Sequence, residues 1–117
     1  MARPYFLQGA ATTNLTLVQK NLTKVKGWYC SSLDATPVYI LLYDAAATTD
    51  VTVGTTAPKW KIMIPSNNTA ANGAGANAAG YELRFDLGLV IATVTGIATT
   101  DATAISANEV IINLEIE

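Results

Sequence analysis

Three stretches of this chain alternate apolar and polar residues with a period of two, and this alternation restricts the fold more than any other feature. The stretches are residues 59–64 ("KWKIMI"), 81–87 ("YELRFDL") and 109–117 ("EVIINLEIE"). Because side chains point to opposite sides of a β-strand in turn, each stretch predicts a half-buried strand. The apolar faces comprise Trp60, Ile62, Ile64, Tyr81, Leu83, Phe85, Leu87, Val110, Ile112, Leu114 and Ile116. Of these, we predict that Trp60, Ile62, Leu83, Phe85, Ile112 and Leu114 lie in the core.

Further strands are predicted at residues 14–19, 24–32 and 38–43, with one or two more after residue 88. These segments are rich in β-branched and aromatic residues and are bounded by Asn, Gly and Ser. Helical periodicity is missing, and one helical turn near residues 102–108 is the most that the pattern allows. The chain therefore predicts an all-β fold, an antiparallel β-sandwich or jelly roll of about 7–8 strands. We expect one such domain over residues 14–117, preceded by an N-terminal arm over residues 1–13.

The strand at residues 38–43 ("VYILLY") is apolar or amphipathic on both faces. A sheet face of this kind is not left open to water at low cost, so something must cover each side of it. One candidate cover is the segment 45–58 of the same chain. The other is a neighbouring subunit or host surface, in which case Tyr39, Leu41 and Tyr43 would form an interface.

A long segment of small residues, "SNNTAANGAGANAAG" (residues 66–80), separates two of the alternating stretches. Loops of this length without structure of their own are uncommon in compact domains. It contains no charge and no aromatic ring, so it can act neither as an acid or base nor as a metal site. Two interpretations remain: an exposed loop, or a strap that docks on another surface through its backbone, with Asn68, Asn72 and Asn77 at the contact.

The composition argues against several classes of function. The chain has no histidine, which excludes Ser-His-Asp and Cys-His centres and histidine metal sites. Its nine carboxylates are spread singly, and four of them, Asp34, Asp44, Asp50 and Asp101, lie in expected turns, although such turn aspartates leave a Ca²⁺ site open. We therefore expect no enzyme, no catalytic residue, no cofactor and no metal. A net charge of −2 argues against a nucleic acid partner.

Other features bear on where the protein is found. No apolar run is long enough for a signal peptide or a membrane span, so we expect a soluble protein that is made in a host cytoplasm and has no membrane partner. Cys30 is the single cysteine, which excludes an intramolecular disulfide and favours a small buried side chain.

Two segments resemble a known family. They are "VYILLYDAAATTDVTVGTTAPKWKIMIPSN" (residues 38–67) and "GYELRFDLGLVIATVTGIATTDATAISANEVIINLEIE" (residues 80–117). The similar elements are a Tyr-rich strand running into Tyr-Asp-x-Ala, a Val-Gly-Thr-x-x-Pro turn, an Ile-x-Ile-Pro strand end, Gly-Leu before a Gly-Ile segment, and a final Val-Ile-Ile-Asn-Leu strand. In these elements the chain resembles small virion proteins of tailed bacteriophages over about two-thirds of its length.

This resemblance implies a capsid-associated β-sandwich, most plainly a decoration or cement protein on the outside of a phage head. It implies the major capsid protein as partner and a homotrimer as the assembly, because cement proteins often occupy threefold sites. Arg3, Tyr5 and Phe6 of the arm would then anchor the protein on the shell. The alternatives for this segment are a frayed terminus or an added edge strand.

A function of another class is a carbohydrate- or receptor-binding module of a phage fibre or tail. Trp28 and Trp60 could stack on sugar rings. Because Trp60 shares a face with Ile62 and Ile64, a place in the core is favoured for it.

Overall fold

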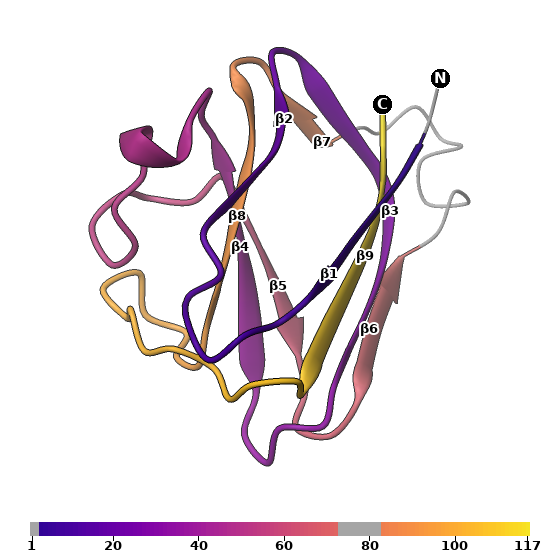
Figure 1. Ribbon diagram of the computed structural model, residues 1–117, viewed down its shortest axis with the longest axis vertical. Coiled ribbons are helices and arrows are strands. Elements are labelled where there is room, and N and C mark those ends of the chain that lie inside the picture. Colours follow the sequence, from indigo (N-terminus) through magenta and orange to yellow (C-terminus); the bar gives the residue numbers. More distant parts are fainter. Residues whose placement is uncertain (1–2, 73–82) are drawn as a thin grey trace.

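The chain folds into two antiparallel sheets packed face to face, which confirms the predicted β-sandwich (Figure 1). The computed structural model describes residues 3–72 and 83–117. Sheet A contains β1 (Arg3–Gln8), β9 (Val110–Ile116), β3 (Thr23–Ser32), β6 (Thr69–Asn72) and β7 (Leu83–Phe85). Sheet B contains β2 (Thr16–Lys20), β8 (Gly88–Val94), β4 (Val38–Asp44) and β5 (Trp60–Ile64).

The order of the strands is that of a jelly roll. Sheet A runs β1-β9-β3-β6 and sheet B runs β2-β8-β4-β5. β7 also pairs with β3, along a different part of that strand from β6. β6 pairs with the second half of β3 and β7 with its first three residues, so together they fill one strand position. With that position counted once, the chain forms two four-stranded sheets, and successive strands change sheet except β4 and β5, which pair with each other in sheet B; this is the order of the two Greek keys of a jelly roll.

The core lies between the sheets and is made by the inward residue of each alternating pair. Ile62, Leu83, Phe85, Ile112 and Leu114 are all buried there, as the period-two pattern predicts. Phe85 is fully buried and is one of the largest side chains in the core. Five of the six residues that the alternation placed in the core are therefore buried there.

The segment expected to be an arm is an edge strand from Arg3 to Gln8. β1 pairs antiparallel with β9 over its whole length, with Tyr5 opposite Leu114. Arg3 closes the same edge of the sandwich, because its guanidinium donates a hydrogen bond of 2.7 Å to Gln19 of β2. The second alternative for this segment, an added edge strand, is the observed one.

The small-residue segment at residues 66–80 also differs from its prediction, because part of it is a strand and not a loop. Residues 69–72 form β6, in which Ala70 lies opposite Cys30 and packs against the core. Small side chains suit this edge position because they allow close approach to β3. The part of the expected loop after residue 72 lies outside the described residues, as does Tyr81.

Two residues of the alternating pattern are not in the core. Trp60 lies opposite the buried Leu42, but it begins the edge strand β5 and stays 37% exposed at the rim of the sandwich. Leu87 is also exposed, because β7 ends at Phe85 and the chain crosses to the other sheet. That crossing ends at Gly88, whose φ of +147° favours glycine, and a Cβ there would lie 2.7 Å from the carbonyl oxygen of Ala45.

Helical structure in the described residues is limited to one 3₁₀ turn, η1 (Thr48–Asp50). The helical turn considered near residues 102–108 is not formed, and Ile105 in that segment is instead buried in the core. Among the described residues no helix has the length and apolar character needed to cross a bilayer.

The two phenylalanines provide a direct test of this core. Phe85→Ala should lower the free energy of unfolding by about 3–5 kcal/mol, because it leaves a cavity between the sheets. Phe6→Ala, at a side chain that is exposed in β1, should change it by less than about 1 kcal/mol. Urea unfolding followed by fluorescence measures both, and equal losses would contradict the assignment of inner and outer faces.

Candidate functional site

The outer face of sheet B is apolar and is covered by the chain itself. Tyr39, Leu41 and Tyr43 pack there with Val90, Ala92 and Val94 of β8. The cover includes Ala45, Val51 and Val53 of the segment between β4 and β5, which carries η1 on the outer side of the sheet (Figure 1). Of the two candidate covers, the intramolecular one is observed.

Tyr39, Leu41 and Tyr43 are therefore not available to a partner. Their exposed fractions are 9%, 3% and 1%, so the prediction that they form an interface is wrong. Tyr43 is unusual under this cover: its hydroxyl is buried and has no hydrogen-bond partner within the described part of the chain. Burial also raises the pKa of Tyr43, because the phenolate would lose its hydration.

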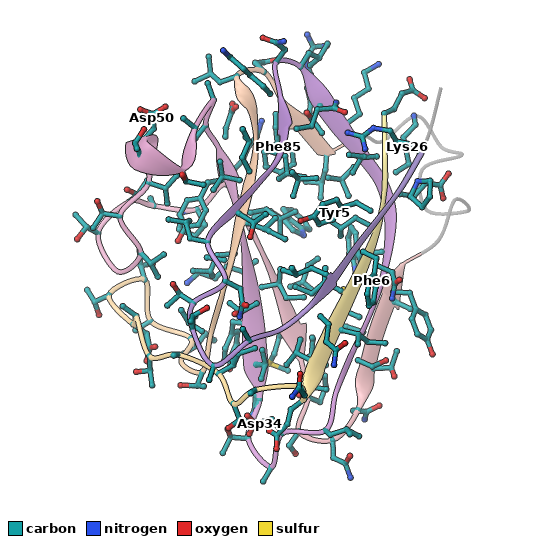
Figure 2. The ribbon with its side chains drawn as sticks, in the orientation of Figure 1. Tyr5, Phe6, Lys26, Asp34, Asp50 and Phe85 are labelled. Carbon is teal, nitrogen blue, oxygen red and sulfur yellow. The ribbon has the colours of Figure 1, made fainter. Side chains whose placement is uncertain are left out.

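The outer face of sheet A has no such cover among residues 3–72 and 83–117. Register places Phe6, Asn113, Tyr29 and Ala71 in one row across β1, β9, β3 and β6. Phe6 is 59% exposed and Tyr29 is 55% exposed, so no described residue covers either ring. Figure 2 shows Phe6 directed away from the sandwich and Tyr5 directed between its sheets.

A second row on the same face lies one step along the strands. It consists of Gln8, Ile111, Ser31 and Thr69, which belong to the same four strands. Hydrogen bonds order the polar members of the two rows: the Asn113 side-chain amide donates to the Tyr29 carbonyl oxygen at 3.1 Å, and the hydroxyls of Ser31 and Thr69 lie 3.1 Å apart. We call these two rows the bare face: Phe6, Gln8, Tyr29, Ser31, Thr69, Ala71, Ile111 and Asn113.

The two rows of the bare face contain aromatic and aliphatic groups, amides and hydroxyls; the exposed Glu115, two residues after Asn113 on the same face of β9, borders them with a negative charge. Leu33 extends it beyond β3, because it follows Ser31 by two residues and its N–H continues the ladder to the Glu109 carbonyl oxygen at 2.8 Å. Leu33 is 72% exposed. Exposed apolar groups gathered on one sheet face indicate an interaction surface.

The structure separates the other predicted contact residues. Phe6 belongs to the bare face, whereas Tyr5 is half-buried against the core and Arg3 is held by Gln19. Asn68 is exposed at the turn before β6, where its carbonyl oxygen accepts a hydrogen bond from Ser32 N–H at 2.9 Å. Asn72 ends β6 opposite Trp28, and Asn77 lies outside the described residues.

Tyr29, Ile111 and Asn113 of the bare face were not predicted. Trp28 and Tyr29 are adjacent in β3, so one of the two rings must point outward. The segment alone does not say which, because a register shift between Val25 and Gly27 interrupts the alternation. The alternation of residues 109–117 puts Asn113 on the side opposite Ile112 and Leu114, but its neighbours across the sheet depend on strand pairing.

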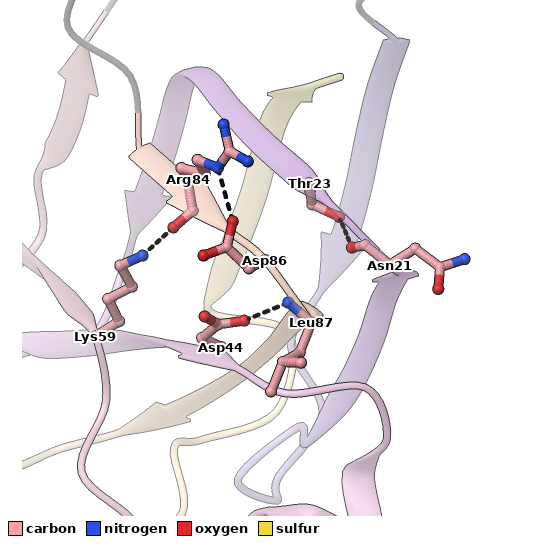
Figure 3. A network of polar contacts seen from close by, with 7 residues as sticks. All are labelled: Asn21, Thr23, Asp44, Lys59, Arg84, Asp86 and Leu87. Atoms are coloured by element: carbon pink, nitrogen blue, oxygen red, sulfur yellow. Dashed lines mark hydrogen bonds and ion pairs between the residues drawn. The ribbon is translucent and has the colours of Figure 1, made fainter.

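Charged residues at the upper end of the sandwich join its sheets. The Lys59 ammonium donates a hydrogen bond to the Arg84 carbonyl oxygen and lies 5.3 Å from the Phe85 ring centroid (Figure 3). Asp44 accepts a hydrogen bond from Leu87 N–H at 2.8 Å. The Arg84 guanidinium, 2.7 Å from the Asp86 carboxylate, lowers the pKa of that carboxyl group. These contacts fasten the β7–β8 crossing.

Other reactive groups have structural surroundings. Asp34 closes its own turn by accepting a hydrogen bond from Thr36 N–H at 2.9 Å, which lowers the pKa of its carboxyl group. Burial raises the pKa of the Cys30 thiol to about 11, so the thiolate that reacts with reagents is scarce at neutral pH. In the described residues no three His, Cys, Asp or Glu side chains gather as metal ligands would.

A shallow groove of about 340 Å³ lies beside β5. It is lined by Ala57, Pro58, Lys59, Trp60, Lys61 and Thr99. Lys61 is held there by a hydrogen bond of 2.7 Å from its ammonium group to the Ile97 carbonyl oxygen. The groove combines an aromatic residue with hydrogen-bond donors, which are groups that a small ligand can contact.

Comparison with known proteins does not assign the chain to a family. No family model matches it, and no curated protein matches it. A solved structure of a Bacillus endospore appendage protein, described as forming disulfide-linked pili, is 14% identical with a TM-score of 0.49, over 99% of this chain and 82% of that chain. The coat protein of Tobacco streak virus is 9% identical with a TM-score of 0.37, over 97% of this chain and 85% of that one. A second structure of that coat protein, as a dimer, is 10% identical with a TM-score of 0.40, over 97% of this chain and 84% of that chain. All three TM-scores lie below 0.5, and none of these likenesses supports an inference about this chain.

The cover of sheet B can be tested at its unpaired hydroxyl. Tyr43→Phe should leave the free energy of unfolding unchanged or raise it by about 1 kcal/mol, because a buried hydroxyl without a partner is destabilising. Tyr29→Phe removes an exposed hydroxyl and serves as the control, with a change expected within about 0.5 kcal/mol. A loss of more than about 1 kcal/mol in Tyr43→Phe alone would show that this hydroxyl is hydrogen-bonded in solution.

Proposed function

We propose that this protein is a non-enzymatic structural component of a virion, a decoration or cement protein that attaches to the outside of a phage head and stabilises it. The observation that carries the proposal is the contrast between the two outer faces. Sheet B is covered by its own chain, whereas the bare face of sheet A presents Phe6 and Tyr29 to solvent. A surface of this kind suits permanent contact with another protein.

The chemistry of the bare face favours a protein shell as its partner. Burying an aromatic ring of this size contributes about 1.5–3 kcal/mol, and the side chains of Gln8, Ser31 and Asn113 can hydrogen-bond to an opposing surface. Each single attachment would be modest. Neighbouring copies on one particle stabilise it together, since every copy holds its own part of the shell.

The sequence supports the same assignment independently. Residues 38–67 and 80–117 resemble small virion proteins of tailed phages, and jelly rolls recur among viral capsid proteins. The fold alone does not identify a function, because jelly rolls also serve as lectins. The bare face and the sequence resemblance together favour the virion.

Attachment can be measured with variants of one exposed residue on the bare face and one elsewhere. Tyr29→Ser should lower the occupancy of purified phage heads at least about tenfold, whereas Leu87→Ser, in the β7–β8 crossing, should bind as the unchanged protein does. Heads that carry Tyr29→Ser should also rupture at a lower temperature. Gold-labelled antibody on native particles provides a second measurement. Its absence from heads, or equal occupancy for both variants, would reject the proposal.

A carbohydrate-binding module remains the second candidate, and the exposure of Trp60 beside the groove favours it. Under this alternative, soluble oligosaccharides should quench or shift tryptophan fluorescence, and Trp60→Ala should abolish binding. Trp28→Phe is the control for the other tryptophan, which packs against the core. An unchanged response after Trp60→Ala, or no binding across a panel of neutral and acidic glycans, would eliminate this candidate.

A further inference from the structure

We infer that residues 46–58, which cover the outer face of sheet B between β4 and β5, form a lid that opens while the sandwich stays folded. Opening exposes apolar residues of that face to water, among them Tyr39, Leu41, Tyr43 and Val90. The lid moves in the free molecule and lies on the other sheet from the bare face, so its opening does not depend on the proposed attachment to a head.

The lid contains its own set of hydrogen bonds. Its η1 turn closes through Val51 N–H, which donates to the Thr48 carbonyl oxygen at 3.1 Å. A second turn closes through Thr56 N–H, which donates to the Thr52 carbonyl oxygen at 2.8 Å, while Thr52 N–H donates to the Thr56 hydroxyl at 2.9 Å. Within the described residues, no hydrogen bond joins residues 46–58 to another part of the chain. The lid therefore keeps its hydrogen bonds when it leaves the sheet.

Both ends of the lid are fixed to sheet B. Ala45 N–H donates to the Gly88 carbonyl oxygen at 3.1 Å, and Lys59 N–H donates to the Leu42 carbonyl oxygen at 2.8 Å. Because Trp60 pairs with Leu42, the two ends leave the sheet near the same point (Figure 1). Compact surface loops with neighbouring ends, known as Ω-loops, pack mainly on their own side chains. These two anchors define the boundaries of the moving segment.

Few contacts hold the lid against the rest of the protein. Val51 is buried and Val53 is partly buried against the outer face of sheet B. At the tip, a Cβ on Gly54 would lie 3.1 Å from the Thr100 carbonyl oxygen and 3.2 Å from the Ala102 Cβ. The φ of Gly54 is +91°, a conformation that favours glycine. The closed position thus depends on two valine side chains and one close backbone approach.

The closed lid also buries a polar group at a cost. The Tyr43 hydroxyl is inaccessible and has no hydrogen-bond partner within the described part of the chain. A buried hydroxyl without a partner is destabilising, so the hydration that follows opening recovers this loss. The strands beneath stay paired, because the ladders that join β2, β8, β4 and β5 include no residue of the lid.

The open state is the minor one. Minor conformers of folded proteins are populated at about 0.1–10%. The closed lid therefore hides the apolar face of sheet B in most free molecules, and opening exposes it transiently. A thiol beneath the lid should accordingly react about 10- to 1,000-fold more slowly than an exposed thiol.

Labelling with a maleimide tests the lid. Cys30 is fully buried between the sheets and is the internal reference, because its labelling requires global unfolding. Val90→Cys places a thiol of similar volume on the outer face of sheet B and should be labelled at least about tenfold faster than Cys30 in the same molecule, as peptide masses resolve. Val38→Cys, the same substitution on the inner face of that sheet, should be labelled as slowly as Cys30. Thr55→Cys, exposed on the lid, gives the rate of a free thiol.

Urea separates lid opening from global unfolding. Global unfolding exposes the whole core, so the labelling rate of Cys30 should rise about fivefold or more per molar urea below the unfolding midpoint. Lid opening exposes much less surface, so the labelling rate of Val90→Cys should rise by less than about twofold per molar. Circular dichroism checks that each variant is folded before labelling.

A substitution at the tip tests what keeps the lid closed. Gly54→Ala adds a Cβ against the Thr100 carbonyl oxygen and should raise the labelling rate of Val90→Cys at least about tenfold. Thr55→Ala, at the next residue, removes an exposed side chain and should leave this rate within about twofold.

Four results would overturn the inference. The first two are equal labelling rates for Val90→Cys and Cys30, and an equally steep dependence of the two rates on urea. The others are labelling of Val90→Cys as fast as that of Thr55→Cys, and no effect of Gly54→Ala. None of these measurements uses phage particles, so their failure is distinguishable from a failure of attachment to the head.

Discussion

The burial of β4 and β8 on both faces is the constraint from which the rest of the architecture follows. Every residue of β8 is buried, as are the first six of β4, so neither strand can face water on either side. Sheet A covers the inner face, and the segment between β4 and β5 covers the outer one. That segment includes a 3₁₀ turn, and it is long because it has to cross the sheet. Within the described part of the chain, no segment covers the outer face of sheet A in a comparable way.

Sheet A differs from sheet B, because the outer side of its central strand is partly exposed to water. Its central strand β9 has buried residues on the inner side and Ile111, Asn113 and Glu115 on the outer side, so the sheet tolerates water on one face. The flanking strands β1 and β3 nevertheless place Phe6 and Tyr29 on that outer face. An antiparallel sheet with a solvated face needs no aromatic residues there for its own stability. Their presence is better explained by contact with another molecule.

The edges of the sandwich are closed by single polar contacts. Arg3 and Gln19 join β1 to β2 on one side, while Lys59 and the Arg84 carbonyl oxygen join the start of β5 to β7 on the other. Exposed edge strands invite uncontrolled pairing with other chains, and charged residues reduce that risk. Under the proposed function, attachment occurs at a sheet face, where side chains rather than backbone groups decide what binds.

The sequence by itself determined the all-β class and the part of the core that comes from the alternating strands, because a period-two pattern shows which side of a strand is buried wherever the other side faces water. Ile62, Phe85 and Ile112 follow that rule. It failed for Trp60 and Leu87, since burial at a rim or in a crossing depends on which elements lie opposite. Only the tertiary structure decided that Tyr39, Leu41 and Tyr43 are covered from within the chain. The bare face likewise needed the structure, because Phe6, Tyr29 and Asn113 are far apart in sequence and become neighbours only through the register of β1, β9 and β3.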